Sequence, residues 1–151
     1  MATTAENSPL PRFTGEFRHR IEGKSRVTVP SAWRFDEAVD LFMLRRTVFK
    51  CIGVLPRAEL DRLQDVATAT MTPENRARFL HQFASRIFQI TLDKAGRITI
   101  PDELCAEYGI KGEVWLTGAL DTFNIWNVAD FEEQRKKHEP HDDNLMRQLG
   151  L

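Results

Sequence analysis

The sequence predicts an α+β fold, mainly β with helices, in which two tandem copies of one small β-hairpin module form one pseudo-twofold barrel. Two observations lead to this prediction. A stretch near the N-terminus recurs 71 residues later, and apolar and polar residues alternate there with the period of a half-buried strand. One copy holds too few strands for an independent core, so we expect the two copies to pack together.

Two segments of the chain are similar in sequence: residues 15–34, GEFRHRIEGKSRVTVPSAWR, and residues 85–104, SRIFQITLDKAGRITIPDEL. Both contain an acidic residue, three further residues, an arginine, and then Val/Ile-Thr-Val/Ile-Pro. The offset of 71 relates Arg26 to Arg97, and apolar character continues to match without a gap, with Met43 aligned to Val114. Chance similarity explains this poorly, so we infer a duplicated module.

The first part of each copy predicts a strand, a tight turn and a second strand. In the second copy, residues 87–92 alternate as a strand, and Asp93-Lys94-Ala95-Gly96 is a turn whose glycine takes a positive φ. Residues 97–100 are rich in β-branched side chains and predict the second strand. Pro101 suits the first turn of a helix, which Gly109 should terminate.

The rest of each copy predicts a hairpin followed by a helix. Residues 113–117 and 122–126 form two strands around a turn at residues 118–121. Asn127 has the character of an N-cap for a helix that we expect to end near His138. The first copy follows the same order, and its last helix begins near Pro56.

A helical connector joins the copies. Residues 58–69 carry apolar side chains near helical spacing, and Thr72-Pro73-Glu74 predicts the start of a second helix that ends close to Arg86. The chain is expected to divide into a mobile tail at 1–11, a first module at 12–60, the connector at 61–82, a second module with its helix at 83–138, and a tail at 139–151.

Charge is unevenly distributed along the chain. Residues 12–60 hold ten Lys and Arg against six Asp and Glu, whereas residues 61–151 hold eleven against fifteen. A basic first half is the electrostatic footprint expected of a phosphate-binding surface, although an ordinary solvated surface gives the same balance.

Composition and motifs disfavour several classes of protein. No apolar run predicts a membrane helix and no secretory signal is visible, so we expect a cytoplasmic protein without a membrane partner. Cys51 and Cys105 have apolar neighbours and are predicted to be core residues. No nucleophile, P-loop or zinc-protease motif is found, so we expect no enzyme and no cofactor. Pro140 lies between His138 and His141 and disfavours a metal site there.

Three segments carry a family resemblance: GEFRHRIEGKSRVTVP at 15–30, LDKAGRITIP at 92–101, and GALDTFNIW at 118–126. From about Phe13 to Phe131 the chain resembles the MraZ family, a bacterial relative of the AbrB-type swapped-hairpin regulators. The resemblance implies a double AbrB-like fold and a nucleoid-associated, DNA-binding regulator of a cell-division and cell-wall operon. It also implies a homo-oligomeric ring and an operator with short direct repeats.

The resemblance implies that the signature arginines, Arg26 and Arg97, contact DNA. Glu22 and Asp93 precede them by four residues across each turn, where a carboxylate can orient a guanidinium through paired hydrogen bonds. A purely structural ion pair that closes the turn is the alternative. Glu22 stands where the family has Asp, and Ser25 where it usually has Gly, so the first turn is expected to differ in shape.

Further basic residues extend the predicted DNA surface. Lys24 and Lys94 occupy the turns, and Arg18 and Arg20 alternate onto one face of the first strand. For these two arginines, a solvated strand face is the alternative. Aromatic residues are candidates for the interface of a ring: Phe42, Phe49, Trp115, Phe123 and Trp126. Most of them are expected in the core instead.

Two other functions are compatible with the residues. One is a nucleoid-associated architectural protein with little sequence specificity. The other is an antitoxin-like AbrB module whose main ligand is another protein, which the full duplication and the helical connector disfavour. Equal affinity for operator and scrambled DNA would indicate the architectural protein.

Overall fold

The computed structural model describes residues 12–35 and 37–151, so the expected tail at residues 1–11 lies outside the described residues. In chain order the elements are β1 (Glu16–Arg20), β2 (Arg26–Thr28), the 3₁₀ helix η2 (Ser31–Trp33), β3 (Val39–Arg45), β4 (Ile52–Pro56), α1 (Arg57–Thr70), α2 (Pro73–Ala84), β5 (Phe88–Leu92), β6 (Arg97–Thr99), α3 (Asp102–Tyr108), β7 (Glu113–Gly118), β8 (Phe123–Asn127) and α4 (Val128–Gln148). The predicted order of elements in both copies and the two connector helices are confirmed.

The strand order is symmetric under the duplication. One six-stranded sheet has the order β1-β7-β8-β4-β3-β5, and β2 and β6 form a separate two-stranded ladder. The duplication relates β1 to β5, β2 to β6, β3 to β7 and β4 to β8. When each strand is replaced by its counterpart, the large sheet has the same order read from the other edge, and the small ladder is unchanged. Among the described strands the large sheet is open at β1 and β5, so closure into a barrel stays a prediction.

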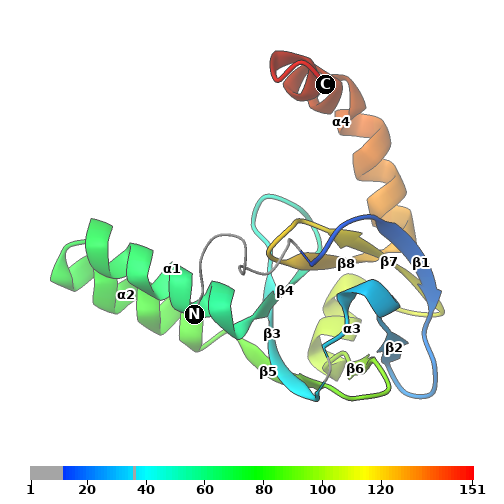
Figure 1. Cartoon of the computed structure of the whole chain (residues 1–151), viewed down its shortest axis with the longest axis horizontal. Coiled ribbons are helices and arrows are strands. Elements are labelled where there is room, and N and C mark those ends of the chain that lie inside the picture. The colour runs from blue at the N-terminus through cyan, green and yellow to red at the C-terminus, as the bar shows by residue number, and fades with distance from the viewer. Residues whose placement is uncertain (1–11, 36) are drawn as a thin grey trace, which may run out of the picture.

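The first two strands of each copy pair with the other copy. β1 runs antiparallel to β7, β5 runs antiparallel to β3, and β2 pairs with β6. Each predicted strand–turn–strand unit keeps its turn, but its two strands take their partners from the other copy (Figure 1). The exchange buries Val27 and Ile98, which are 0% and 1% exposed, opposite each other in the β2–β6 ladder.

The gapless alignment is wrong in β3 and β7. Val54 and Ile125 are equivalent at the offset of 71, and they pair with Met43 and Leu116 respectively. Met43 therefore corresponds to Leu116, at an offset of 73, and not to Val114. The β3–β4 loop, residues 46–51, is two residues longer than the β7–β8 loop, residues 119–122. A slip of two residues keeps the same side chains facing the core, so the apolar pattern does not reveal it.

The main core cluster is built from both copies. Trp33, 1% exposed, packs against Phe13 and Phe123 with ring centroids 5.7 and 5.0 Å apart. Its indole Nε1 donates a hydrogen bond to the Thr14 carbonyl at 3.0 Å, which satisfies the buried donor. The expectation that the halves pack on each other is confirmed, because the core cluster continues through Val27 and Ile98.

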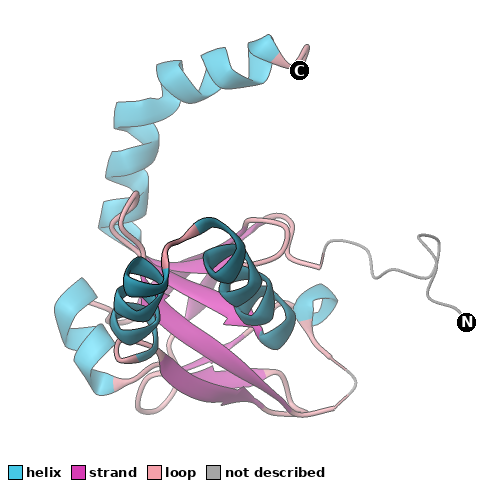
Figure 2. Cartoon of the chain, turned by 90° about the vertical axis from the view of Figure 1, so that its left-hand side faces the viewer, coloured by secondary structure: helices cyan, strands magenta, loops and turns pink. Residues whose placement is uncertain are grey.

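Two helical features project from the sheets (Figures 1 and 2). The α1–α2 hairpin leaves the sheet after β4, and none of the side chains of α2 is fully buried. α4 leaves after β8 and buries only Phe131.

The expected end of the last helix near His138, with a tail from residue 139, is wrong. α4 continues to Gln148 with Pro140 inside it, and it changes direction along its length (Figure 2). Proline removes one backbone hydrogen bond and bends a helix, but the helix resumes when the following residues are good helix formers.

Candidate nucleic-acid interface

The β2–β6 ladder brings the two signature arginines to one face. Val27 and Ile98 point into the core, so the residues on either side of them point to the opposite, outer face. We call this surface the ladder face, and it consists of Arg26, Thr28, Arg97 and Thr99. Arg26 lies opposite Thr99 and Arg97 opposite Thr28. The two arginines are therefore diagonal neighbours about 7–8 Å apart.

Each turn is held in place by the other copy. The backbone N–H of Ile100 donates to the Ser25 carbonyl at 2.9 Å, and the N–H of Val29 donates to the Gly96 carbonyl at 2.8 Å. These two bonds are equivalent under the duplication. They fix both turns at the ends of one rigid ladder, so the arginines are presented on a preorganised surface.

The second turn is clamped by Asp93. Its Oδ1 accepts the backbone N–H of Arg97 at 2.9 Å, and its Oδ2 lies 3.5 Å from the Arg97 Nε. The backbone N–H of Arg97 is the main reason that the pKa of the Asp93 carboxyl is lowered, so the clamp is ionised at neutral pH. Gly96 closes the turn at a φ of +84°, and a Cβ there would collide with the Arg34 guanidinium.

The first turn has a different shape, as its composition predicted. Gly23 and Ser25 both take positive φ values, +52° and +71°. The N–H of Arg26 donates to the backbone carbonyl of Glu22 at 3.0 Å. In the second turn, the equivalent N–H of Arg97 donates to the side chain of Asp93 instead. The Glu22 carboxylate instead accepts the Thr28 hydroxyl at 3.4 Å. Within residues 12–35 and 37–151, no ion pair joins Glu22 to Arg26.

The other predicted basic residues divide into two places. Lys24 is 86% exposed and lies 3.7 Å from Asp102, and Lys94 is exposed in the second turn. Both lysines therefore flank the ladder face. Arg18 belongs to β1 and lies 3.1 Å from Glu113 and 3.8 Å from a carboxylate of α4.

Arg20 is exposed at the end of β1, where it pairs in register with Glu113. The outer face of β1 thus meets acidic partners from β7 and α4, and it is distinct from the ladder face.

Sequence reasoning did not single out Thr28, Thr99 or Arg34. The alternation in R-V-T and R-I-T contained the signal for both threonines, because residues two apart share a strand face. The place of Arg34, whose Nε donates to the Val29 carbonyl at 3.1 Å while the side chain covers Gly96, had no sequence signal.

Other features of the described residues do not form a reactive centre. No group of three or more His, Cys, Asp or Glu side chains there is arranged to hold a metal ion. Among the described helices, none has the length and apolar character needed to cross a membrane.

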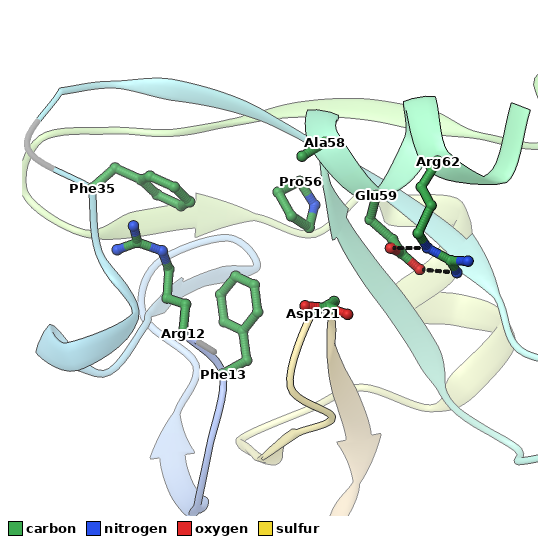
Figure 3. A pocket seen from close by; sticks show the side chains of 8 residues that line it. All are labelled: Arg12, Phe13, Phe35, Pro56, Ala58, Glu59, Arg62 and Asp121. Atoms are coloured by element: carbon green, nitrogen blue, oxygen red, sulfur yellow. Dashed lines mark hydrogen bonds and ion pairs between the residues drawn. The ribbon is translucent and has the colours of Figure 1, made fainter. Parts of the chain in front are cut away.

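A surface pocket of about 320 Å³ lies between the start of the described chain and α1 (Figure 3). Two of its charged groups are paired, since Glu59 and Arg62 form a bidentate contact at 2.8 and 2.7 Å. Arg12 stacks over the Phe35 ring at 3.8 Å.

Comparison with known proteins places the chain in a family. A family model described as "MraZ protein, putative antitoxin-like" matches residues 83–149, which include the second turn and α4. A protein of Pediococcus pentosaceus named "Transcriptional regulator MraZ" is 31% identical over 139 residues, covering 91% of this chain and 96% of that protein. With this identity over nearly the whole length and the duplicated turn signature on one face, the chain belongs to the MraZ family.

Proposed function

We propose that this protein is a non-enzymatic, sequence-specific DNA-binding transcriptional regulator. The observation that carries the proposal is the ladder face, on which Arg26 and Arg97 project side by side from a rigid two-stranded ribbon. Two-stranded ribbons fit the major groove of DNA, and arginine binds both phosphate and guanine. The name of the Pediococcus relative supports the same function.

The basic residues would contact DNA from two places, the ladder face with its turns and the strand β1. Arg26 and Arg97 contact DNA from the ladder face, and Lys24 and Lys94 add phosphate contacts from the turns. Arg18 and Arg20 extend the contact along β1, where Arg18 would have to exchange its carboxylate partners for phosphate. A salt titration of the double variant Arg18→Ala/Arg20→Ala tests this extension, because an unchanged salt slope removes both residues from the phosphate contacts.

A ring of identical subunits completes the proposal. A single ladder face binds weakly, whereas a closed ring presents many copies to an operator with short direct repeats, which raises the effective concentration. Of the aromatic candidates for the ring interface, Phe123 and Trp126 are buried in the subunit, whereas Phe49 is 43% exposed. The regulated DNA would be the promoter of a cell-division and cell-wall operon, so the protein would act in the cytoplasm at the nucleoid.

The pseudo-twofold barrel belongs to the same proposal. The reversal symmetry of the strand order and the two equivalent turn bonds support two modules closed around one axis.

The test is a fluorescence-anisotropy titration with DNA from upstream of the protein's own gene and a scrambled duplex of equal length. Wild-type protein should bind the upstream DNA at least 10³-fold more tightly at physiological salt, within the usual range for specific binders. Arg26→Ala/Arg97→Ala should lose binding to both duplexes. Wild-type binding of equal strength to both duplexes would favour an architectural protein, and no binding to either would favour the protein-binding alternative.

A further inference from the structure

We propose that the two turns divide DNA recognition unequally, with Arg97 reading a base edge and Arg26 neutralising phosphate. This inference rests on the proposed DNA-binding function and assigns a different role to each half of the ladder face. The difference between the turns is visible in their hydrogen bonds.

One carboxylate hydrogen-bonds the backbone of Arg97 and forms an ion pair with its guanidinium. Asp93 binds its backbone N–H at 2.9 Å and lies 3.5 Å from its Nε. The Nε is itself buried and faces inward, while the side chain as a whole is 41% exposed. The exposed edge of the guanidinium is therefore the one that carries its two Nη groups.

An edge that carries two donors suits the paired acceptors of guanine. Arginine reads guanine by donating two parallel hydrogen bonds to O6 and N7, which requires a defined orientation of the guanidinium plane. An ion pair that restricts this plane before binding lowers the entropy lost on contact. Asp93 is thus a positioning residue for base recognition by Arg97.

Arg26 lacks a corresponding clamp in the described structure. The Glu22 carboxylate is occupied by the Thr28 hydroxyl at 3.4 Å, and the backbone N–H of Arg26 is held by a carbonyl. The Arg26 guanidinium lies over Gly23, where a Cβ would come within 3.2 Å of Nη2. A phosphate accepts hydrogen bonds from many directions, so an arginine without a fixed plane suits phosphate better than a base.

Charge-conserving variants separate the two roles. Arg97→Lys and Arg26→Lys each keep a positive charge but remove the planar fork. We expect Arg97→Lys to lower the operator-to-scrambled affinity ratio about tenfold or more with an unchanged salt slope. Arg26→Lys should leave that ratio within about twofold of wild type. Arg26→Ala should weaken binding to both duplexes equally and reduce the salt slope by about one.

The positioning role of Asp93 is tested by the affinity ratio and salt slope of a further variant. Asp93→Asn keeps an oxygen acceptor for the Arg97 N–H but removes the charge that faces Nε, so the affinity ratio should fall while the salt slope stays constant. The reverse change, Glu22→Asp/Ser25→Gly, gives the first turn the aspartate and the glycine of the second. In that background, Arg26→Lys should now lower the affinity ratio. Thermal unfolding of each variant identifies any that fail to fold.

The outcomes distinguish this inference from the proposed function. If Arg26→Lys and Arg97→Lys lower the affinity ratio equally, or Arg26→Lys lowers it more, the unequal division is overturned while DNA binding stands. If Arg26→Ala/Arg97→Ala binds both duplexes as wild type does, the proposed function itself fails.

Discussion

Ser25 occupies a backbone conformation that normally selects glycine. Its φ of +71° costs a residue with a Cβ about 1–2 kcal/mol. Glycine relieves this strain but loses more entropy on folding, about 0.5–1 kcal/mol. We therefore expect Ser25→Gly to raise the free energy of unfolding by about 0.5 kcal/mol, measured by urea denaturation.

Gly96 provides the matched control at the equivalent position of the second turn. Gly96→Ala combines a positive φ with a collision against Arg34, so it should lower the free energy of unfolding by about 2 kcal/mol or more. Effects of the same sign at both positions would contradict the account of the two turns.

Cys51 is predicted to be chemically inert in the folded protein. The side chain is 0% exposed, and burial raises the pKa of its thiol to about 12. The reactive thiolate is then about one molecule in ten thousand at pH 8. Iodoacetamide at pH 8 should modify Cys105, which is half-buried, well before Cys51.

Mass spectrometry of peptides measures both cysteines in one sample. In guanidinium chloride the two residues should react at similar rates, which controls for reagent access. Faster native labelling of Cys51 than of Cys105 would show that the second aromatic cluster around Trp126 opens readily.

At the level of elements, we expect the outer part of α4 to contribute little to the stability of the folded chain. Phe131 is buried against Trp115 and Trp126, with ring centroids 5.1 and 5.2 Å away, whereas every residue from Arg135 onward is exposed. Removing residues 139–151 should change the free energy of unfolding by less than about 0.5 kcal/mol. Phe131→Ala should lower it by about 3–5 kcal/mol.

Differential scanning calorimetry at low protein concentration measures both variants. Light scattering on the shortened protein reports separately whether the exposed Leu145, Met146 and Leu149 take part in self-association. A large loss in the free energy of unfolding on shortening would contradict the exposed position of this segment.

The elements show where sequence reasoning succeeds and where it fails. Turn chemistry and the N-caps of α2 and α4 are local, and both caps form as expected, with Thr72 accepting from Asn75 and Asn127 from Asp130. Pro140 misled the prediction, because proline disfavours a helix interior without prohibiting it. The slip in β3 was hidden because the pleat repeats every two residues.

The candidate site was also predicted only in part from local sequence patterns. The acid–x–x–x–Arg spacing identified both turns, but the partner of each carboxylate depends on backbone shape. The Glu22 carboxylate bonds to Thr28 in a turn where Gly23 and Ser25 both take positive φ values, and the spacing of acid and arginine does not reveal this. Long-range strand pairing is not encoded in any local pattern.

The whole molecule depends on strand exchange between its halves. β1 needs β7, β2 needs β6, and β5 needs β3, so each half lacks partners for its own first two strands. We expect residues 1–71 and residues 72–151, produced separately, to give no cooperatively unfolding monomer. An equimolar mixture should recover the circular dichroism and NMR dispersion of the intact chain.

Each half alone, at rising concentration, is the control for this experiment. Any structure that it gains should depend on concentration, because only another chain can supply the missing strands. A half that unfolds cooperatively at nanomolar concentration as a monomer would show that strand exchange is dispensable.

The β2–β6 ladder pairs Val27 with its own counterpart Ile98, as the two subunits of a homodimer would pair one residue with itself. In a homodimer, any substitution appears on both sides at once. Joining the copies in one polypeptide lifts that constraint, so one turn can acquire Glu22 and Ser25 while the other keeps Asp93 and Gly96. Covalent linkage thus lets a symmetric scaffold acquire two chemically different ends, which would give any ligand bound across the ladder face a defined orientation.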